Sequence, residues 1–171
     1  MTTPISGSQS LSQIMSDIDL GPAGGIQMMF AKLQMAQSQI CKNQANDYMA
    51  QIQDIQAEQK ACASMIEKAR ALQNTAKTDG KATTMPADMK KFFDDRGLSF
   101  DKTGNDTKHN KDEWEYNLKS LTNYQEQIGS KTQTLMVYLQ DFIGQHNSFL
   151  QGANTAISNA NQVLTNIARG Q

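Results

Sequence analysis

The chain has 171 residues and a formal net charge of −1, and only 6% of its residues are aromatic. This near-neutral charge, without a basic patch, argues against a nucleic-acid partner. No run of about 18 apolar residues is present, so we expect no segment that spans a membrane directly.

Residues 1–24 are predicted to form a flexible, polar N-terminus. The segment is rich in Ser and Thr and lacks the basic and apolar regions of a general secretory signal peptide. Its composition is compatible with an export signal of another kind, and a plain disordered terminus is the alternative. Gly and Pro between positions 21 and 25 break any helix there.

Residues 25–78 are predicted to form the first of two long helices. No Pro or Gly occurs from position 26 to 77, a span far longer than an ordinary globular helix. Small or apolar residues recur every three or four positions, with Gln59 filling the one missing step, which is the spacing of a coiled-coil seam. They are Cys41, Ala45, Tyr48, Ile52, Ile55, Cys62, Ile66 and Ala69, preceded by Ile26, Met29, Phe30 and Leu33.

Residues 79–111 are predicted to form an insert that contains a short helix at 86–95. Pro86 suits the first position of that helix, and Gly97 suits the left-handed turn that ends it. The alternation of residues 98–100 predicts a short extended strand after the helix.

Residues 112–170 are predicted to form the second long helix, whose apolar stripe runs from Leu118 to Ile167 with steps of three or four. Gly129, Gly144 and Gly152 interrupt it, and we expect bends or close approaches of another helix there. The predicted fold class is therefore all-α, with two long antiparallel helices forming an αα-hairpin or coiled coil and a short mixed insert between them. A hairpin covers one side of each helix only, which favours a homo-oligomer over the alternatives of a monomeric hairpin or a small bundle.

Few residues in the sequence suggest chemistry. There is no nucleophile elbow, phosphate loop or carboxylate pair, so we expect no catalytic residue, no cofactor and no enzyme activity. The sequence from Asp101 to Glu113 faintly matches a calcium loop, but a solvated acidic loop is the preferred interpretation. The histidines and cysteines do not have zinc-ligand spacing, so we expect no metal site.

Four further residues have structural interpretations. Cys41 and Cys62 are expected to be buried thiols that do not pair with each other, because about 31 Å of helix would separate them. His109 is expected to be solvated. His146 lies on the stripe and is expected to be a hydrogen-bonded core histidine, with a role in setting the register as the alternative. Trp114 is expected to pack the insert against the second helix, with a contact between subunits as the alternative.

Two segments resemble a known family. Residues 85–101, Met-Pro-Ala-Asp-Met-Lys-Lys-Phe-Phe-Asp-Asp-Arg-Gly-Leu-Ser-Phe-Asp, are similar to the insert helix and the apolar alternation after it in EspA-like and SseB-like proteins of type III secretion systems. Residues 28–38, Met-Met-Phe-Ala-Lys-Leu-Gln-Met-Ala-Gln-Ser, resemble the start of the first long helix in that family. The order of segments over residues 25–170 also matches.

The resemblance implies a secreted structural protein that polymerises at the bacterial cell surface into a hollow helical filament. The filament would extend the type III secretion needle and conduct translocator and effector proteins to the host cell. Expected partners are further copies of the chain, the needle, the pore-forming translocators and a cytoplasmic export chaperone. The alternatives are a needle-tip cap and an intracellular coiled-coil chaperone or adaptor.

In that family the subunits polymerise by coiled-coil packing of their terminal helices, which implies a self-assembly interface on both long helices here. Its expected residues are Leu135, Leu139, Phe142, Phe149, Ala153, Ile157, Ala160, Leu164 and Ile167 on the second helix, and Phe30, Leu33, Ile52, Ile55 and Ile66 on the first.

Overall fold

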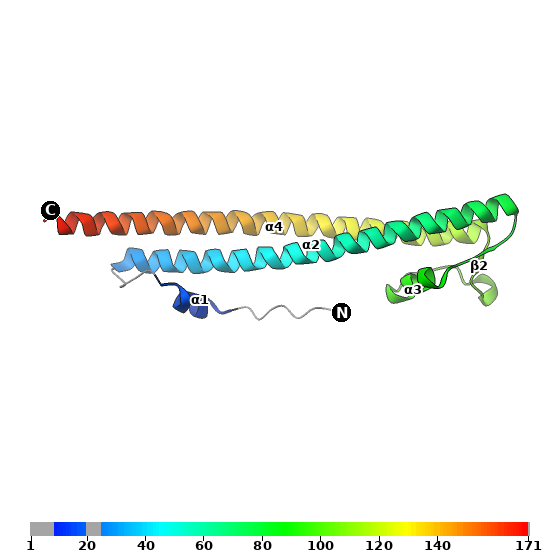
Figure 1. Cartoon of the computed structure of the whole chain (residues 1–171), viewed down its shortest axis with the longest axis horizontal. Coiled ribbons are helices and arrows are strands. Elements are labelled where there is room, and N and C mark those ends of the chain that lie inside the picture. The colour runs from blue at the N-terminus through cyan, green and yellow to red at the C-terminus, as the bar shows by residue number, and fades with distance from the viewer. Residues whose placement is uncertain (1–8, 20–24, 171) are drawn as a thin grey trace. The chain divides into compact units, whose positions relative to one another are not determined.

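The computed structural model describes residues 9–19 and 25–170, and most of them are helical. In chain order the elements are α1 (Leu11–Asp17), α2 (Gly25–Asp79), β1 (Thr83–Thr84), α3 (Ala87–Asp95), a 3-10 helix (Thr103–Asn105), β2 (Lys108–His109) and α4 (Lys111–Ala168). The long helices α2 and α4 pack against each other, and a short insert connects them (Figure 1). The predicted all-α hairpin fold is thus confirmed.

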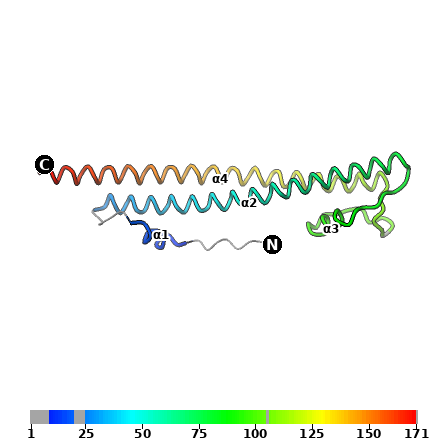
Figure 2. Tube along the Cα trace, in the orientation of Figure 1, coloured from blue at the N-terminus to red at the C-terminus, as the bar shows by residue number. Residues whose placement is uncertain are grey.

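The chain divides into two compact units. The terminal unit consists of Met1–Gln51 and Leu135–Gln171, and the insert unit consists of Ile52–Thr134. Both α2 and α4 contribute a part to each unit. In the insert unit the chain reverses direction between the two helices (Figure 2), so that later residues of α2 meet earlier residues of α4. None of the described helices combines the length and the apolar character that a membrane crossing requires.

The flexibility predicted for the N-terminal segment 1–24 stays a prediction, but the central part of the segment is helical. Residues 11–17 form helix α1, while 1–8 and 20–24 lie outside the described residues. Ser10 caps the helix, because its hydroxyl accepts from the Gln13 backbone N–H and the Gln13 side chain accepts from the Ser10 N–H. Ile14 is buried, so one apolar contact and one capping box together stabilise a short helix that composition alone does not predict.

The insert unit has a core of its own, to which all three of its helices contribute. Helix α3 is held between the long helices and the connecting segments by Met89, Phe92 and Phe93, which are buried. The full set of buried core residues is Cys62, Ile66, Ala69, Ala76, Met85, Met89, Phe92, Phe93, Phe100, Trp114, Leu121 and Ile128. A core of this kind fixes the insert in place, because large apolar side chains gain most from burial.

Trp114 joins the insert to the start of α4, as expected from the sequence. Its ring is fully buried, and its Nε1–H donates to Thr83 Oγ1 over 2.7 Å. Thr83 belongs to β1, which pairs antiparallel with β2 through Thr83 and His109. The indole therefore fixes the two-stranded ribbon against α4.

The ends of α3 follow the sequence signals closely. Pro86 is the N-cap residue rather than the first helical residue, a shift of one position from the prediction. Gly97 has a φ of 62°, and the N–H groups of Gly97 and Leu98 donate to the carbonyl oxygens of Asp94 and Phe93. This is a Schellman ending. Residues 98–100, expected from their alternation to be an extended piece, lie outside the two strands, and Phe100 is buried in the core.

A polar network connects α3 to both long helices. The Arg96 guanidinium binds the Glu58 carboxylate through two hydrogen bonds, and the Tyr124 hydroxyl donates to the same carboxylate over 2.9 Å. Arg96 also lies over the Phe92 ring, 3.7 Å from its centroid. Hydrogen bonds from Arg96 lower the pKa of Glu58 below its ordinary value, against the opposing effect of partial burial.

Candidate assembly interface

Most of the predicted interface residues lie on the faces that α2 and α4 present to each other. Five of them are buried, namely Ile52, Ile66, Leu135, Ala153 and Ala160. Six are half-buried, namely Leu33, Ile55, Leu139, Phe142, Phe149 and Ile157. Only Phe30, Leu164 and Ile167 are exposed. The buried side chains pack within one chain, and the predicted role in self-assembly stays a prediction for all fourteen residues.

Contacts across the seam of the terminal unit explain this burial. The Tyr48 ring of α2 lies 5.5 Å from Phe142 and 5.8 Å from Tyr138, centroid to centroid. A Cβ added at Gly152 would meet the Gln34 side chain at 3.0 Å, so this glycine marks a close approach of α4 to α2. Helix α4 thus already has a helical partner along much of its stripe.

His146 is hydrogen-bonded, as expected, but it is half-buried rather than buried in the core. Its Nδ1 lies 2.7 Å from the Ser38 hydroxyl and 3.0 Å from the Ser38 carbonyl oxygen. The Ser38 hydroxyl also reaches the His146 carbonyl oxygen at 3.3 Å. Ser38 is itself buried, so each residue satisfies the polar groups of the other and the pair fixes the local register.

The two cysteines are buried and free, as expected. Cys62 donates to the Leu121 carbonyl oxygen over 3.5 Å, and Cys41 lies 3.7 Å from Gln145 Oε1. Burial raises the pKa of both thiols, and the nearby Asp141 carboxylate adds to this effect at Cys41. Neither thiol is therefore activated for chemistry.

The apolar surface that remains exposed is concentrated in one unit. Of the exposed large apolar side chains in the described residues, all but Tyr116 belong to the terminal unit. They are Leu11, Ile26, Met29, Phe30, Met49, Met136, Val137, Tyr138, Ile143, Leu150, Val163, Leu164 and Ile167. A single-chain hairpin does not require this surface, and contiguous exposed apolar surface marks sites of association.

Burial of the apolar stripe of α4 ends at a defined residue. Ala153, Ala156 and Ala160 are buried, but every residue from 161 to 170 is exposed. Val163 and Ile167 continue the same face at steps of three and four, and are 47% and 65% exposed. The last turns of α4 therefore present an apolar face that no described residue covers.

The start of α2 presents a second apolar face. Ile26, Met29 and Phe30 lie at spacings of three and four, and Ile26 is 86% exposed. Beside them is a groove of about 580 Å³. Its walls are formed by Ile26, Gln27 and Phe30 of α2 and by Ser148, Gln151, Gly152, Thr155, Ala156 and Asn159 of α4.

Several exposed apolar residues of α4 lie outside the stripe that the sequence predicts. Met136, Val137 and Tyr138 stand between the stripe positions Leu135 and Leu139, so this part of α4 is apolar on all sides. A helix that is apolar all round needs more than one neighbour. That pattern is the signal by which the additional surface could have been found.

We also compared the chain with known proteins. No family model, no curated protein and no solved structure matches it.

Proposed function

We propose that this chain is a structural subunit that polymerises with copies of itself into an extracellular filament of a type III secretion system. The proposal is supported above all by the distribution of apolar surface. In the insert unit every large apolar side chain except Tyr116 is buried or half-buried, whereas the terminal unit exposes many. Each square ångström of apolar surface removed from water contributes about 25 cal/mol, so copies of the chain gain by covering this surface for one another.

The positions of the two exposed apolar faces, at the end of α4 and at the start of α2, favour an open polymer. In the proposed contact, the uncovered turns of α4 around Leu164 and Ile167 lie on the face around Ile26 and Phe30 of the next copy. The two faces belong to different parts of the chain, so the contact joins unlike surfaces. Contacts of unlike surfaces that do not close into a ring generate helical filaments. Packing of one helix end on another would continue the seam as a coiled coil.

The remaining parts of the proposal follow from the resemblance of residues 28–38 and 85–101. The filament would extend the secretion needle and conduct pore-forming translocators and effectors to a host cell. A cytoplasmic export chaperone would cover the apolar surface of the terminal unit before secretion, because free subunits would otherwise associate inside the cell. The chain acts in this scheme as a structural protein and not as an enzyme.

The test compares charged substitutions on the two units. We expect the purified wild-type protein to form long hollow filaments in negative-stain electron microscopy. Leu164→Asp and Ile167→Asp should remain monomeric in sedimentation, with unchanged helicity in circular dichroism, because both side chains are exposed in the single chain. Tyr116→Asp is the matched control, since Tyr116 is also exposed but belongs to the insert unit, and it should polymerise normally.

Other outcomes would point to other functions. Normal filaments from both α4 variants would refute the proposed contact. Closed rings of wild-type protein would favour a needle-tip cap. A stable heterodimer with a second small protein, without filaments, would favour an intracellular chaperone or adaptor.

A further inference from the structure

One residue of the insert contradicts its sequence interpretation. His109 was expected to be solvated, but its side chain is fully buried. It packs edge-on against Trp114 and Phe100, with ring centroids 5.1 and 6.4 Å away. The imidazole therefore lies in the aromatic part of the core, where its nitrogens cannot rely on bulk water.

Neither ring nitrogen of His109 has a hydrogen-bond partner. Leaving a buried polar atom unpaired costs about 1–3 kcal/mol, so such atoms are rare and call for an explanation. Among the described residues, the only other buried side-chain atom without a partner is Asn117 Nδ2. The Asn117 Oδ1 accepts from the Asp101 backbone N–H over 2.7 Å, which places both unsatisfied residues around Asp101.

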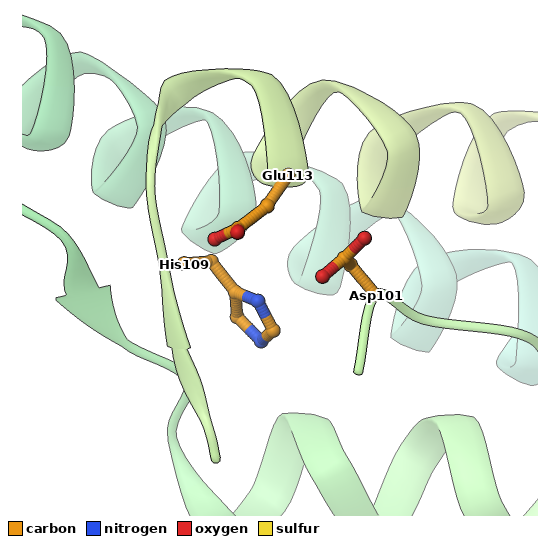
Figure 3. Close-up of side chains that lie close together, drawn as sticks. All are labelled: Asp101, His109 and Glu113. Atoms are coloured by element: carbon orange, nitrogen blue, oxygen red, sulfur yellow. The ribbon is translucent and has the colours of Figure 1, made fainter. Parts of the chain in front are cut away.

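Two carboxylates approach the imidazole from different segments. Asp101 follows α3, His109 ends β2, and Glu113 lies in the first turn of α4. Figure 3 shows the three side chains pointing toward one another. One ligand atom from each residue lies within 4.8 Å of the other two. The cluster therefore brings together three segments of the insert unit at one point.

One oxygen of each carboxylate accepts a hydrogen bond from the backbone, which leaves the other oxygen free for a ligand. Asp101 Oδ1 accepts from the Thr103 N–H over 2.8 Å, and Glu113 Oε2 accepts from the Asn110 N–H over 2.7 Å. The latter bond completes a capping box, because Asn110 Oδ1 accepts in turn from the N–H groups at the start of α4. Both carboxylates are thus held in position by the backbone, as the ligands of a metal site usually are.

The charge of the cluster is unbalanced. No ion pair involves Asp101 or Glu113 in the described part of the chain. Burial lowers the pKa of His109, against the opposing effect of the Glu113, Asp101 and Asp106 carboxylates. An imidazole nitrogen without a hydrogen-bond partner can bind a cation, and two carboxylates match the charge of a dication.

We propose that Asp101, His109 and Glu113 bind a divalent transition-metal ion of the zinc class. Such ions accept mixed imidazole and carboxylate ligands, whereas Ca²⁺ and Mg²⁺ prefer oxygen ligands only. Ligand atoms around tetrahedral zinc stand about 3.3 Å apart, so the half-buried carboxylates need only small rotations to close on the ion. Three protein ligands leave one position for water. The ion would pin β2 and the segment after α3 to the start of α4.

In the test, ZnCl₂ is titrated into chelator-treated full-length protein, and calorimetry measures the binding. The background is Cys41→Ser/Cys62→Ser, so that thiols do not contribute to binding. We expect one Zn²⁺ per chain and a higher melting temperature with zinc than with a chelator. Asp101→Asn and Glu113→Gln should each weaken binding at least about tenfold. Each of these substitutions keeps the oxygen that accepts from the backbone, so the fold should survive.

Asp106→Asn is the matched control, because Asp106 lies in the same insert and accepts from the Lys108 N–H but stands outside the cluster. Its zinc affinity should fall much less than that of Asp101→Asn or Glu113→Gln, because Asp106 acts on the cluster only through its charge. Co²⁺ provides a second readout, since its visible absorption should show a nitrogen and oxygen ligand set that changes in His109→Gln. The proposal is overturned by an absence of Zn²⁺ binding at micromolar concentration, by equal affinity in all variants, or by Ca²⁺ binding more tightly than Zn²⁺.

Discussion

Replacing Arg96 with methionine should destabilise the insert unit by about 1–2 kcal/mol. The substitution removes both hydrogen bonds to Glu58 but keeps an unbranched side chain over the Phe92 ring. Hydrogen bonds to charged groups contribute about 1.5–3 kcal/mol. The two side chains are 24% and 27% exposed, so solvent screens part of this contribution and the lower part of the range applies.

The effect should depend on pH in a defined direction. Arg96 lowers the pKa of Glu58 from its ordinary value of about 4.5. Between the folded and unfolded pKa values the unfolded chain binds more protons, so stability rises with pH in that window. The contribution of Glu58 is therefore fully present above about pH 4.5 and is lost as the pH falls through the lower pKa of the folded state. Arg96→Met should remove this part of the acid sensitivity.

Trp114 fluorescence during urea unfolding is the suitable assay, because the only tryptophan of the chain is buried in the insert unit. The matched control is Lys91→Met, which removes the cation of an exposed ion pair with Asp95 on α3. Exposed pairs on one helix contribute about 0.3–0.5 kcal/mol, so the control should be nearly neutral. Equal effects of the two substitutions, or an unchanged acid limb in Arg96→Met, would refute the reasoning.

Two further substitutions probe the helix seam and the core. Gly144→Ala should raise the stability by about 0.5–1 kcal/mol in thermal unfolding. The position is inside a helix, and a Cβ there meets no atom within 4 Å. A loss of stability would mean that another segment packs on Gly144. Phe93→Ala should lower the free energy of unfolding, followed by Trp114 fluorescence, by about 3–5 kcal/mol, because it opens a cavity at a fully buried core position. A loss below about 1 kcal/mol would show that α3 does not depend on this core.

The sequence predicted the long helices well because their signals are long and redundant. The absence of Pro and Gly between positions 26 and 77 and the repeated three-and-four spacing act over many turns, so no single contact can override them. The end of α3 was also predictable, because Gly97 supplies the left-handed residue that a Schellman ending requires. Local rules sufficed at this helix end, but they also exist at α1, where the capping box of Ser10 and Gln13 went unrecognised.

The cluster of the insert was not predictable in this way. The sequence places His109 among charged and polar residues, which favours a solvated side chain. Its burial depends on Trp114 and Phe100, and the approach of Asp101 depends on how the segment after α3 returns to α4. Only Asn110 gave a local signal, since a capping residue three positions before Glu113 fixes that carboxylate at the start of the helix.

The stripe of α4 shows why a heptad pattern leaves its own partner undetermined. A seam of apolar residues predicts that a helix packs against another helix. That second helix can belong to the same chain or to another copy, because either one buries the seam equally well. The register decides between them, and the Ser38–His146 pair fixes that register in the terminal unit. With α2 beginning at Gly25 and α4 extending to Ala168, burial of the stripe by the described residues ends after Ala160. In the proposed filament, self-assembly through the stripe therefore uses the turns that follow, and substitutions before Ala160 should act on folding first.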